Sequence, residues 1–171
     1  MERLWSMSGP PAPIRELCLA GSRDEWMLAI DVEGNGILWD MHQRQPVLSV
    51  SKRQGRVAAG TLTADGTLCL GYADGDIRWI VRGVPNSNRS ILGHAAEVSI
   101  VRPLHERDLV ATGGADGEIR LWRLAAEGPV VIFPEVGWPL SCAVSTAGQL
   151  MFGNNLGDVM VIRARVHECA F

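Results

Sequence analysis

Short apolar segments alternate with turns rich in glycine, aspartate and asparagine along almost the whole chain. The segments at residues 68–70, 109–112 and 159–162 are representative. Their length, the turn residues that bound them and the lack of a 3.6-residue period predict β-strands rather than helices. Several are apolar at consecutive positions, which indicates that both faces of their sheets are covered. The pattern therefore predicts an all-β protein whose sheets stack against one another.

The turns recur at a nearly constant interval. Four of them end in glycine, at positions 34, 75, 117 and 157, so the intervals are 41, 42 and 40 residues. A large apolar residue follows each glycine at the same distance; these residues are Trp39, Ile80, Trp122 and Ile162. A period of about 40 residues is typical of propellers and other repeat folds. We expect a single domain over 1–171 with four units at about 14–52, 55–92, 96–133 and 138–171.

The third unit shows the strands within a repeat most clearly. Apolar segments lie at 99–101, 109–112, 119–122 and 130–133, and Asp116-Gly117 forms a turn suited to a β-hairpin. Four short strands joined by tight turns predict one antiparallel four-stranded sheet per unit. Stacking four such sheets radially covers their faces, which predicts a β-propeller of about four blades, either small or partial.

The third unit also resembles a known family, the WD-repeat β-propellers. The resemblance rests on Gly93-His94 and on the segment ATGGADGEIRLW at 111–122. In that family a His, a Ser or Thr, an Asp and a Trp form a hydrogen-bonded tetrad within a blade. By position these residues are His94, Thr112, Asp116 and Trp122. The resemblance implies a structural tetrad rather than a catalytic His–Asp dyad.

The other units depart from the family pattern. The first keeps Trp39-Asp40 but has Glu33 in the turn, and the second has Ile80 where the family has Trp. In the fourth unit the residues assigned to the tetrad positions are all apolar: Trp138, Phe152, Leu156 and Ile162. Replacing both sides of a hydrogen bond by apolar groups can be nearly neutral, so we expect these four to pack as a cluster. An exposed Trp138 that anchors a partner is the alternative.

The family geometry implies a face of loops where partners dock near the central channel. Side chains expected there are those of Arg56, Tyr72, Asp74, Trp138, Asn154 and Asn155. Tyr and Arg are frequent interface anchors. Ordinary turn polarity is the alternative explanation for each of them.

Composition narrows the function classes. The chain is 47% hydrophobic with a net charge of −3, which argues against a nucleic-acid binder because phosphate contacts need a basic surplus. No apolar run approaches the ~20 residues of a membrane span. Residues 1–6 carry no apolar signal segment, so a cytoplasmic location is expected.

Cys18, Cys69, Cys142 and Cys169 are expected to be small buried hydrophobes, with no metal site and no cofactor.

Four blades are few for this family, whose members usually have about seven. The chain could be a remnant or fragment of a longer propeller, a half that pairs with itself or another chain, or an unusual closed ring of four. Residues 166–171 are long enough for a closing outer strand. An open arc would expose apolar flanks on its first and last blades, so we expect self-association or a protein partner.

These observations favour a non-catalytic scaffold or regulatory module in a multi-protein assembly. A fragment without independent activity is an alternative. A hydrolase-type enzyme with a site in the central channel is a weaker one. It would need convergent acids, bases or a nucleophile, but the inner segments 58–63, 98–103 and 140–145 offer Ser and Thr with little His, Asp or Glu.

Overall fold

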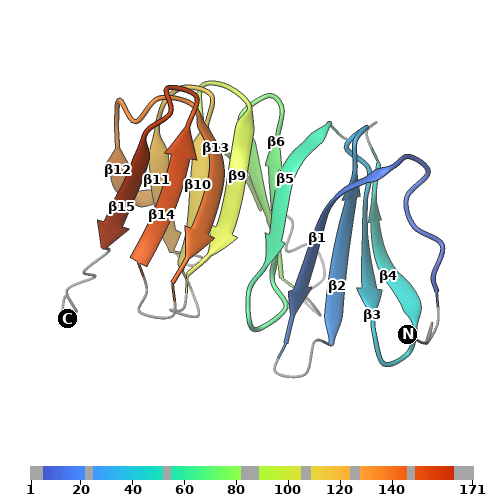
Figure 1. Cartoon of the computed structure of the whole chain (residues 1–171). Helices are drawn as coiled ribbons and strands as arrows, with labels where there is room; N and C mark the ends of the chain where they lie inside the picture. Colours follow the sequence, from blue (N-terminus) through green and yellow to red (C-terminus); the bar gives the residue numbers. More distant parts are fainter. Residues whose placement is uncertain are drawn as a thin grey trace.

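The computed structural model describes residues 6–21, 25–51, 55–81, 89–104, 109–123, 128–145 and 149–163. These ranges contain fifteen strands in four antiparallel sheets (Figure 1). Sheet A holds β1 (Ile14–Ala20), β2 (Trp26–Asp31), β3 (Gly36–Asp40) and β4 (Gln45–Val50). Sheet B holds β5 (Val57–Leu62), β6 (Leu68–Tyr72), β7 (Asp76–Ile80) and β8 (Arg89–Leu92). Sheet C holds β9 (Val98–Pro103), β10 (Leu109–Gly114), β11 (Ile119–Arg123) and β12 (Pro129–Phe133). Sheet D holds β13 (Pro139–Val144), β14 (Gln149–Asn154) and β15 (Val159–Arg163).

Within each sheet the strands follow one another in sequence order, so every sheet is a series of hairpins. The turn between the second and third strands always carries a glycine with positive φ, between 84° and 92°, at Gly34, Gly75, Gly117 and Gly157. Glycine adopts this left-handed conformation without steric cost, which is why the repeat is visible as a glycine spacing. The predicted all-β fold of four-stranded antiparallel sheets is confirmed. The strand expected at 166–171, together with Cys169, lies outside the described residues.

Three apolar cores join the four sheets in sequence. Leu28 and Leu38 of sheet A pack with Leu70 and Tyr72 of sheet B. Sheet B packs on sheet C through the cluster Ala59, Cys69, Ile77, Trp79, Val98, Val101, Val110 and Trp122. Sheet C packs on sheet D through the cluster Leu104, Leu109, Ala111, Ile119, Leu121, Val136, Leu150 and Phe152. Each inner sheet is therefore apolar on both faces, as its consecutive apolar residues predicted.

The sheets form an open arc. The first strand of each sheet lies on the inner side, where β1 packs beside β5, β5 beside β9, and β9 beside β13. Figure 1 shows sheet A at one end of this arc and sheet D at the other. Four sheets closed into a ring would need four cores, whereas the described residues form three. Among the described residues, one face of sheet A and one face of sheet D therefore have no neighbouring sheet.

The cysteines follow this packing. In the part of the chain that the structure describes, Cys18, Cys69 and Cys142 are free thiols. Cys69 is fully buried in the core between sheets B and C, as expected. Cys18 and Cys142 are half-buried, and burial raises the pKa of each thiol to about 11. These two thiols are therefore protonated at neutral pH and poor nucleophiles.

Candidate functional site

Four polar side chains of sheet C form one hydrogen-bonded network. His94 precedes β9, Thr112 lies in β10, Asp116 lies in the turn after β10, and Trp122 lies in β11. The Nδ1 atom of His94 is 3.0 Å from Asp116 Oδ1, and its Nε2 atom is 2.8 Å from Thr112 Oγ1. The indole N–H of Trp122 donates to the same Thr112 oxygen over 2.7 Å. The structure thus places the four predicted tetrad residues in mutual contact.

The hydrogen bonds define the protonation of His94. Its Nδ1–H donates to the Asp116 carboxylate, and its Nε2 accepts the hydroxyl proton of Thr112, whose oxygen accepts from Trp122. A doubly protonated imidazole would leave that hydroxyl proton without an acceptor. Burial lowers the pKa of His94, and the neighbouring Asp116 carboxylate opposes this only in part. His94 is therefore neutral at pH 7.

Acidification should destabilise the protein through His94. Its folded-state pKa lies below the ordinary value of 6.5, so below pH 6.5 the unfolded chain binds the proton and the folded chain does not. We expect the free energy of unfolding to fall by up to about 1.4 kcal/mol per pH unit below pH 6.5. Urea titrations between pH 7 and 5 would measure this slope. The variant His94→Phe should flatten it; an unchanged slope would contradict the assignment.

The network is not arranged for catalysis. Thr112, His94 and Asp116 are connected in the same way as the hydroxyl nucleophile, the histidine base and the orienting acid of a catalytic triad. However, His94 and Thr112 are at most 1% exposed, and the Thr112 oxygen already accepts the Trp122 indole N–H. No substrate could reach the hydroxyl without opening the core. The network instead satisfies buried polar groups and fixes the loop around His94 to sheet C.

Besides Trp138, whose side chain is exposed as expected for a residue of this face, three residues expected on the loop face are exposed there. Asp74 and Asn155 lie in the turns after β6 and β14, and Arg56 lies just before β5. Asp74 accepts the N–H of Asp76 over 3.2 Å, and Asn155 Oδ1 accepts the N–H of Trp138 over 2.8 Å. Arg56 forms an ion pair with Glu97 at 2.9 Å. These three positions remain candidates for contact with a partner.

The expectation that Tyr72 and Asn154 project toward a partner is wrong. Both end the second strand of their sheet and are buried. Tyr72 packs in the core between sheets A and B, with the Arg78 guanidinium 4.3 Å from its ring centre. Asn154 organises its own turn, because its Oδ1 accepts the N–H groups of Leu156 and Asp158, each over 2.9 Å. Both side chains support the fold.

The expectation that four apolar residues of the fourth unit pack as a cluster is also wrong for two of them. Phe152 and Ile162 pack in the core between sheets C and D, but Trp138 is 42% and Leu156 is 71% exposed. The backbone hydrogen bonds explain why Trp138 is exposed. Asn155 donates to the Trp138 carbonyl over 2.9 Å, just as Ala115 donates to Glu97 over 2.8 Å and Ala73 to Arg56 over 3.0 Å. Trp138 therefore occupies the place of Arg56 and Glu97 on the rim of the arc.

The place of His94 is taken in sheet D by Val136. The N–H of His94 donates to the Gly75 carbonyl over 3.0 Å, and that of Val136 donates to the Gly117 carbonyl over 2.9 Å. Val136 is buried and belongs to the core between sheets C and D. The apolar replacement of the tetrad thus exists, with Val136 in the position assigned from sequence to Trp138.

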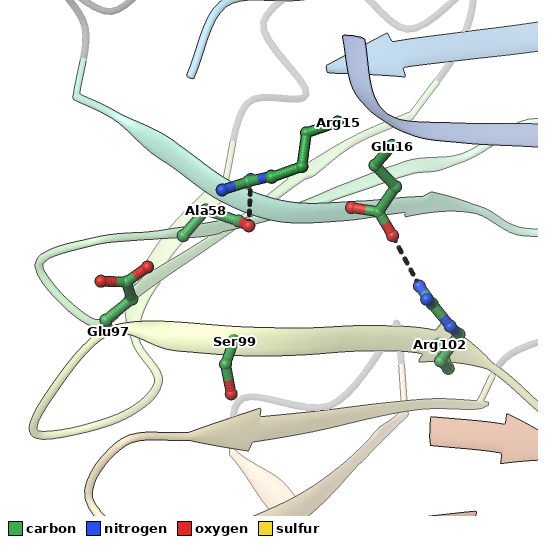
Figure 2. A pocket seen from close by; sticks show the side chains of 6 residues that line it. All are labelled: Arg15, Glu16, Ala58, Glu97, Ser99 and Arg102. Atoms are coloured by element: carbon green, nitrogen blue, oxygen red, sulfur yellow. Dashed lines mark hydrogen bonds and ion pairs between the residues drawn. The ribbon is translucent and has the colours of Figure 1, made fainter. Parts of the chain in front are cut away.

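A polar hollow of about 330 Å³ lies on the inner side of the arc (Figure 2). It is lined by Arg15, Glu16, Ala58, Glu97, Ser99 and Arg102. Arg102 donates to Glu16 over 2.7 Å, and the other Glu16 oxygen accepts the N–H of Gly60 over 3.2 Å. Figure 2 shows Arg15 directed at the Ala58 carbonyl, to which it donates a hydrogen bond. No sequence signal places Glu16 beside Arg102, because 86 positions separate the two residues.

The hollow does not assemble acid–base chemistry. Both of its carboxylates form ion pairs, Glu16 with Arg102 and Glu97 with Arg56. The Ser99 hydroxyl lies 2.5 Å from the Pro139 carbonyl and 3.2 Å from that of Gly113, so it is engaged as a donor to backbone oxygen. Across the described ranges, no three His, Cys, Asp or Glu side chains gather as metal ligands would. Nor does any helix there have the length and hydropathy to cross a bilayer.

Comparisons with known proteins address the fold. No protein-family model matches the sequence, and no curated protein matches it either. A chain in a crystal structure of the mitotic checkpoint complex is similar with a TM-score of 0.73 and 15% identity, over 88% of this chain and 49% of that one. The computationally designed Ika4 protein is similar with a TM-score of 0.75 and 19% identity, over 95% of this chain and 98% of the designed one. This chain thus spans about half the length of the checkpoint chain, and nearly the whole of the designed one. Together with the four radial sheets, these likenesses identify the fold as that of a small β-propeller.

Proposed function

We propose that the chain is a non-catalytic protein-interaction module that binds a partner through the loop-side rim of its arc. The support comes from the exposed pair Trp138 and Leu156. The first of the two similar structures comes from a multi-protein assembly, which favours the same class of function. The buried network in sheet C and the ion-paired hollow supply no reactive group. Among the described residues, Trp138 on this rim is the exposed large aromatic side chain.

The rim pair is held rigidly. Trp138 and Asn155 exchange two hydrogen bonds, of 2.8 and 2.9 Å, which fix the start of β13 to the turn after β14. A Cβ atom on Gly137 would lie 3.3 Å from Leu156 Cδ1, so the Leu156 side chain lies close to the Trp138 backbone. Because the Trp138 backbone is already held in place, binding through this residue costs little backbone conformational freedom. Aromatic anchors of this kind dominate interface energetics.

The neighbouring rim is charged. Arg56 and Glu97 occupy the same position in sheets B and C as Trp138 does in sheet D. Their ion pair is partly exposed, with 42% and 34% of the two side chains accessible. A partner with an apolar residue flanked by polar groups would suit this surface. The Arg56–Glu97 pair would then contribute mainly to orientation, since exposed ion pairs stabilise by 1 kcal/mol or less, roughly.

The variant Trp138→Ala should weaken partner binding at least about 30-fold, as removal of a central aromatic anchor costs about 2 kcal/mol or more. A photo-crosslinking residue at Asn155 would capture the partner in native extract, and titration of the purified partner would give the affinity. Leu92→Ala is the control, because Leu92 is also an exposed large apolar residue but lies in the outer strand β8. An affinity that is unchanged in Trp138→Ala would reject the rim as the binding surface.

We further infer that the chain is a divergent WD-repeat protein. The support is the His94–Thr112–Asp116–Trp122 network, which has the residue types and connectivity of that family's tetrad. Sheet D has replaced it with Val136, Phe152 and Ile162. Such replacement removes the sequence pattern while keeping the sheet.

A further inference from the structure

The sheets dock through a repeated contact on the inner strands. At two of the three junctions, the residue that begins the inner strand packs on a glycine of the preceding sheet: Val98 of β9 on Gly71, and Pro139 of β13 on Gly113. A Cβ atom on Gly71 would lie 2.4 Å from Val98 Cγ1, and one on Gly113 would lie 2.9 Å from Pro139 Cγ. Gly71 and Gly113 pair at equivalent places in their sheets, with Ile77 and Ile119. Each glycine leaves the space that the next sheet fills.

Each end of the arc has one of the two parts of this contact, the glycine at one end and the packing residue at the other. Gly153 pairs with Val159 as Gly71 pairs with Ile77, but no neighbouring sheet covers it. Instead Gly153 lies in a shallow hollow of about 250 Å³, lined also by Ser141, Ala143, Met151 and Val159. At the other end, Ile14 pairs with Asp31 as Val98 pairs with Gly114 and Pro139 with Asn154. Val98 and Pro139 are buried, whereas Ile14 is 43% exposed.

The flanking residues show the same difference. Val159 and Val161 of sheet D stand where Ile119 and Leu121 stand in sheet C. The two sheet C residues are 1% exposed, whereas Val159 and Val161 are 78% and 59% exposed. In sheet A, Leu19 pairs with Met27 as Leu62 pairs with Leu68 in sheet B, yet Leu62 is buried and Leu19 is exposed. Both end faces keep the apolar residues of an inter-sheet core, and no other sheet of the described ranges covers them.

We propose that a second copy of this chain covers both faces. Sheet D of one copy packs on sheet A of the other, and the reverse contact forms at the same time. Ile14 of each copy then fills the Gly153 hollow of its partner. The chain itself supports this choice of occupant, because it carries the projecting residue at one end and the matching hollow at the other. Such an interface is heterologous, and it closes into a ring when the two arcs complete one turn.

The geometry fits a ring of eight sheets. Two arcs of four sheets give eight, which is within the range of known propellers. The arc also matches about half of the longer chain in the checkpoint structure, as an arc that forms half of a larger assembly of sheets would. Pro10 and Pro11 lie near Ile37 and Ser49 on the open side of sheet A, farther from the channel. They leave Ile14, Leu17 and Leu19 of the inner strand exposed for the contact.

Light scattering during gel filtration, together with sedimentation equilibrium, tests the proposal. The full chain should have a mass near twice 18.6 kDa at micromolar concentration. Ile14→Arg and Val159→Arg should each raise the dimer dissociation constant at least ~100-fold, because each places a charge in both copies of the interface. Leu92→Arg, at an exposed apolar residue outside both faces, should remain dimeric. Circular dichroism should show that all three variants keep their strands.

Several results would overturn the ring. A monomeric wild type would do so, as would larger open-ended assemblies. Loss of the dimer in only one of Ile14→Arg and Val159→Arg would show that one face pairs with itself. Dimers that survive both variants would place the interface elsewhere. Loss of rim binding in Trp138→Ala with an intact dimer separates this proposal from the proposed function.

A size exchange tests the register. Gly153→Leu fills the hollow and should weaken the dimer, since its nearest neighbour in the single chain is the Ser141 hydroxyl at 3.1 Å from a Cβ atom. Adding Ile14→Ala to Gly153→Leu restores the space and should recover at least ~10-fold of the lost affinity. Ile14→Ala alone should weaken the dimer by leaving the hollow empty. Equal weakening with and without the second change would reject the Ile14–Gly153 contact.

Discussion

Replacing Asp116 by alanine should lower the free energy of unfolding by about 3 kcal/mol, because it leaves the buried His94 Nδ1–H without an acceptor and removes the acceptor of two backbone N–H groups. The Asp116 carboxylate accepts from His94 Nδ1 at 3.0 Å and from the N–H groups of Ala95 and Glu118 at 2.9 and 3.2 Å. Moving the His94 proton to Nε2 would not repair the loss. Both that proton and the Trp122 indole would then donate to Thr112, and the hydroxyl proton would have no acceptor.

Leu156→Ala is the matched control for Asp116→Ala. Leu156 occupies the same place in the turn of sheet D, where Gly157 donates to Asn154 as Gly117 donates to Gly114. It is 71% exposed, so its truncation should change the free energy of unfolding by about 0.5 kcal/mol or less. Urea denaturation followed by circular dichroism would measure both. Similar losses in the two variants would mean that the turn, and not the network, carries the stability.

The fold was predictable because its signals are local. Glycines with positive φ at one turn of every sheet make the repeat visible as spacing. Consecutive apolar residues such as Leu68, Cys69 and Leu70 predicted a sheet covered on both faces, and all three are buried. The sheet C network was predictable for a different reason, since four residue types at fixed positions resemble a known tetrad. Signals of both kinds can be recognised in the sequence without knowledge of tertiary contacts.

The candidate surface was less predictable because it depends on loop length. From His94 to β9 the chain needs three intervening residues, but from Val136 to β13 it needs two. Alignment of the glycines does not reveal this shortening, so Trp138 was assigned to the buried position that Val136 holds. Tyr72 and Asn154 were misplaced for a related reason. Polar or aromatic character near a turn suggests exposure, but both residues end a strand and face inward.

Contacts across the channel could not be predicted from the sequence for a third reason. Glu16 and Arg102 come from sheets A and C and meet over Gly60 of sheet B. Gly60 lacks a side chain, so Glu16 reaches its N–H and Cys18 lies 3.3 Å from its carbonyl oxygen. Such a bridge depends on the curvature of the arc. The order of strands alone does not specify it.

Replacing Gly75 by alanine should destabilise the protein by at least about 3 kcal/mol. Part of the loss, about 1–2 kcal/mol, comes from the positive φ of 92°, which disfavours any residue with a Cβ atom. The rest comes from a collision with backbone, since that Cβ atom would lie 2.2 Å from the His94 carbonyl oxygen. Backbone cannot rotate away as a side chain can. Gly157→Ala is the control, because its φ is 89° but nothing lies within 4 Å, so it should lose only about 1–2 kcal/mol.

The Gly75 and Asp116 changes should also be coupled. The Gly75 carbonyl accepts the N–H groups of Gly93 and His94 over 3.1 and 3.0 Å, so this turn of sheet B positions the backbone of His94. A displaced His94 would lose its contact with Asp116 before Asp116 is changed. The double variant should therefore lose at least about 1 kcal/mol less than the two single losses combined. Strictly additive losses, measured in the same urea titrations, would show that the tetrad of sheet C does not depend on the turn of sheet B.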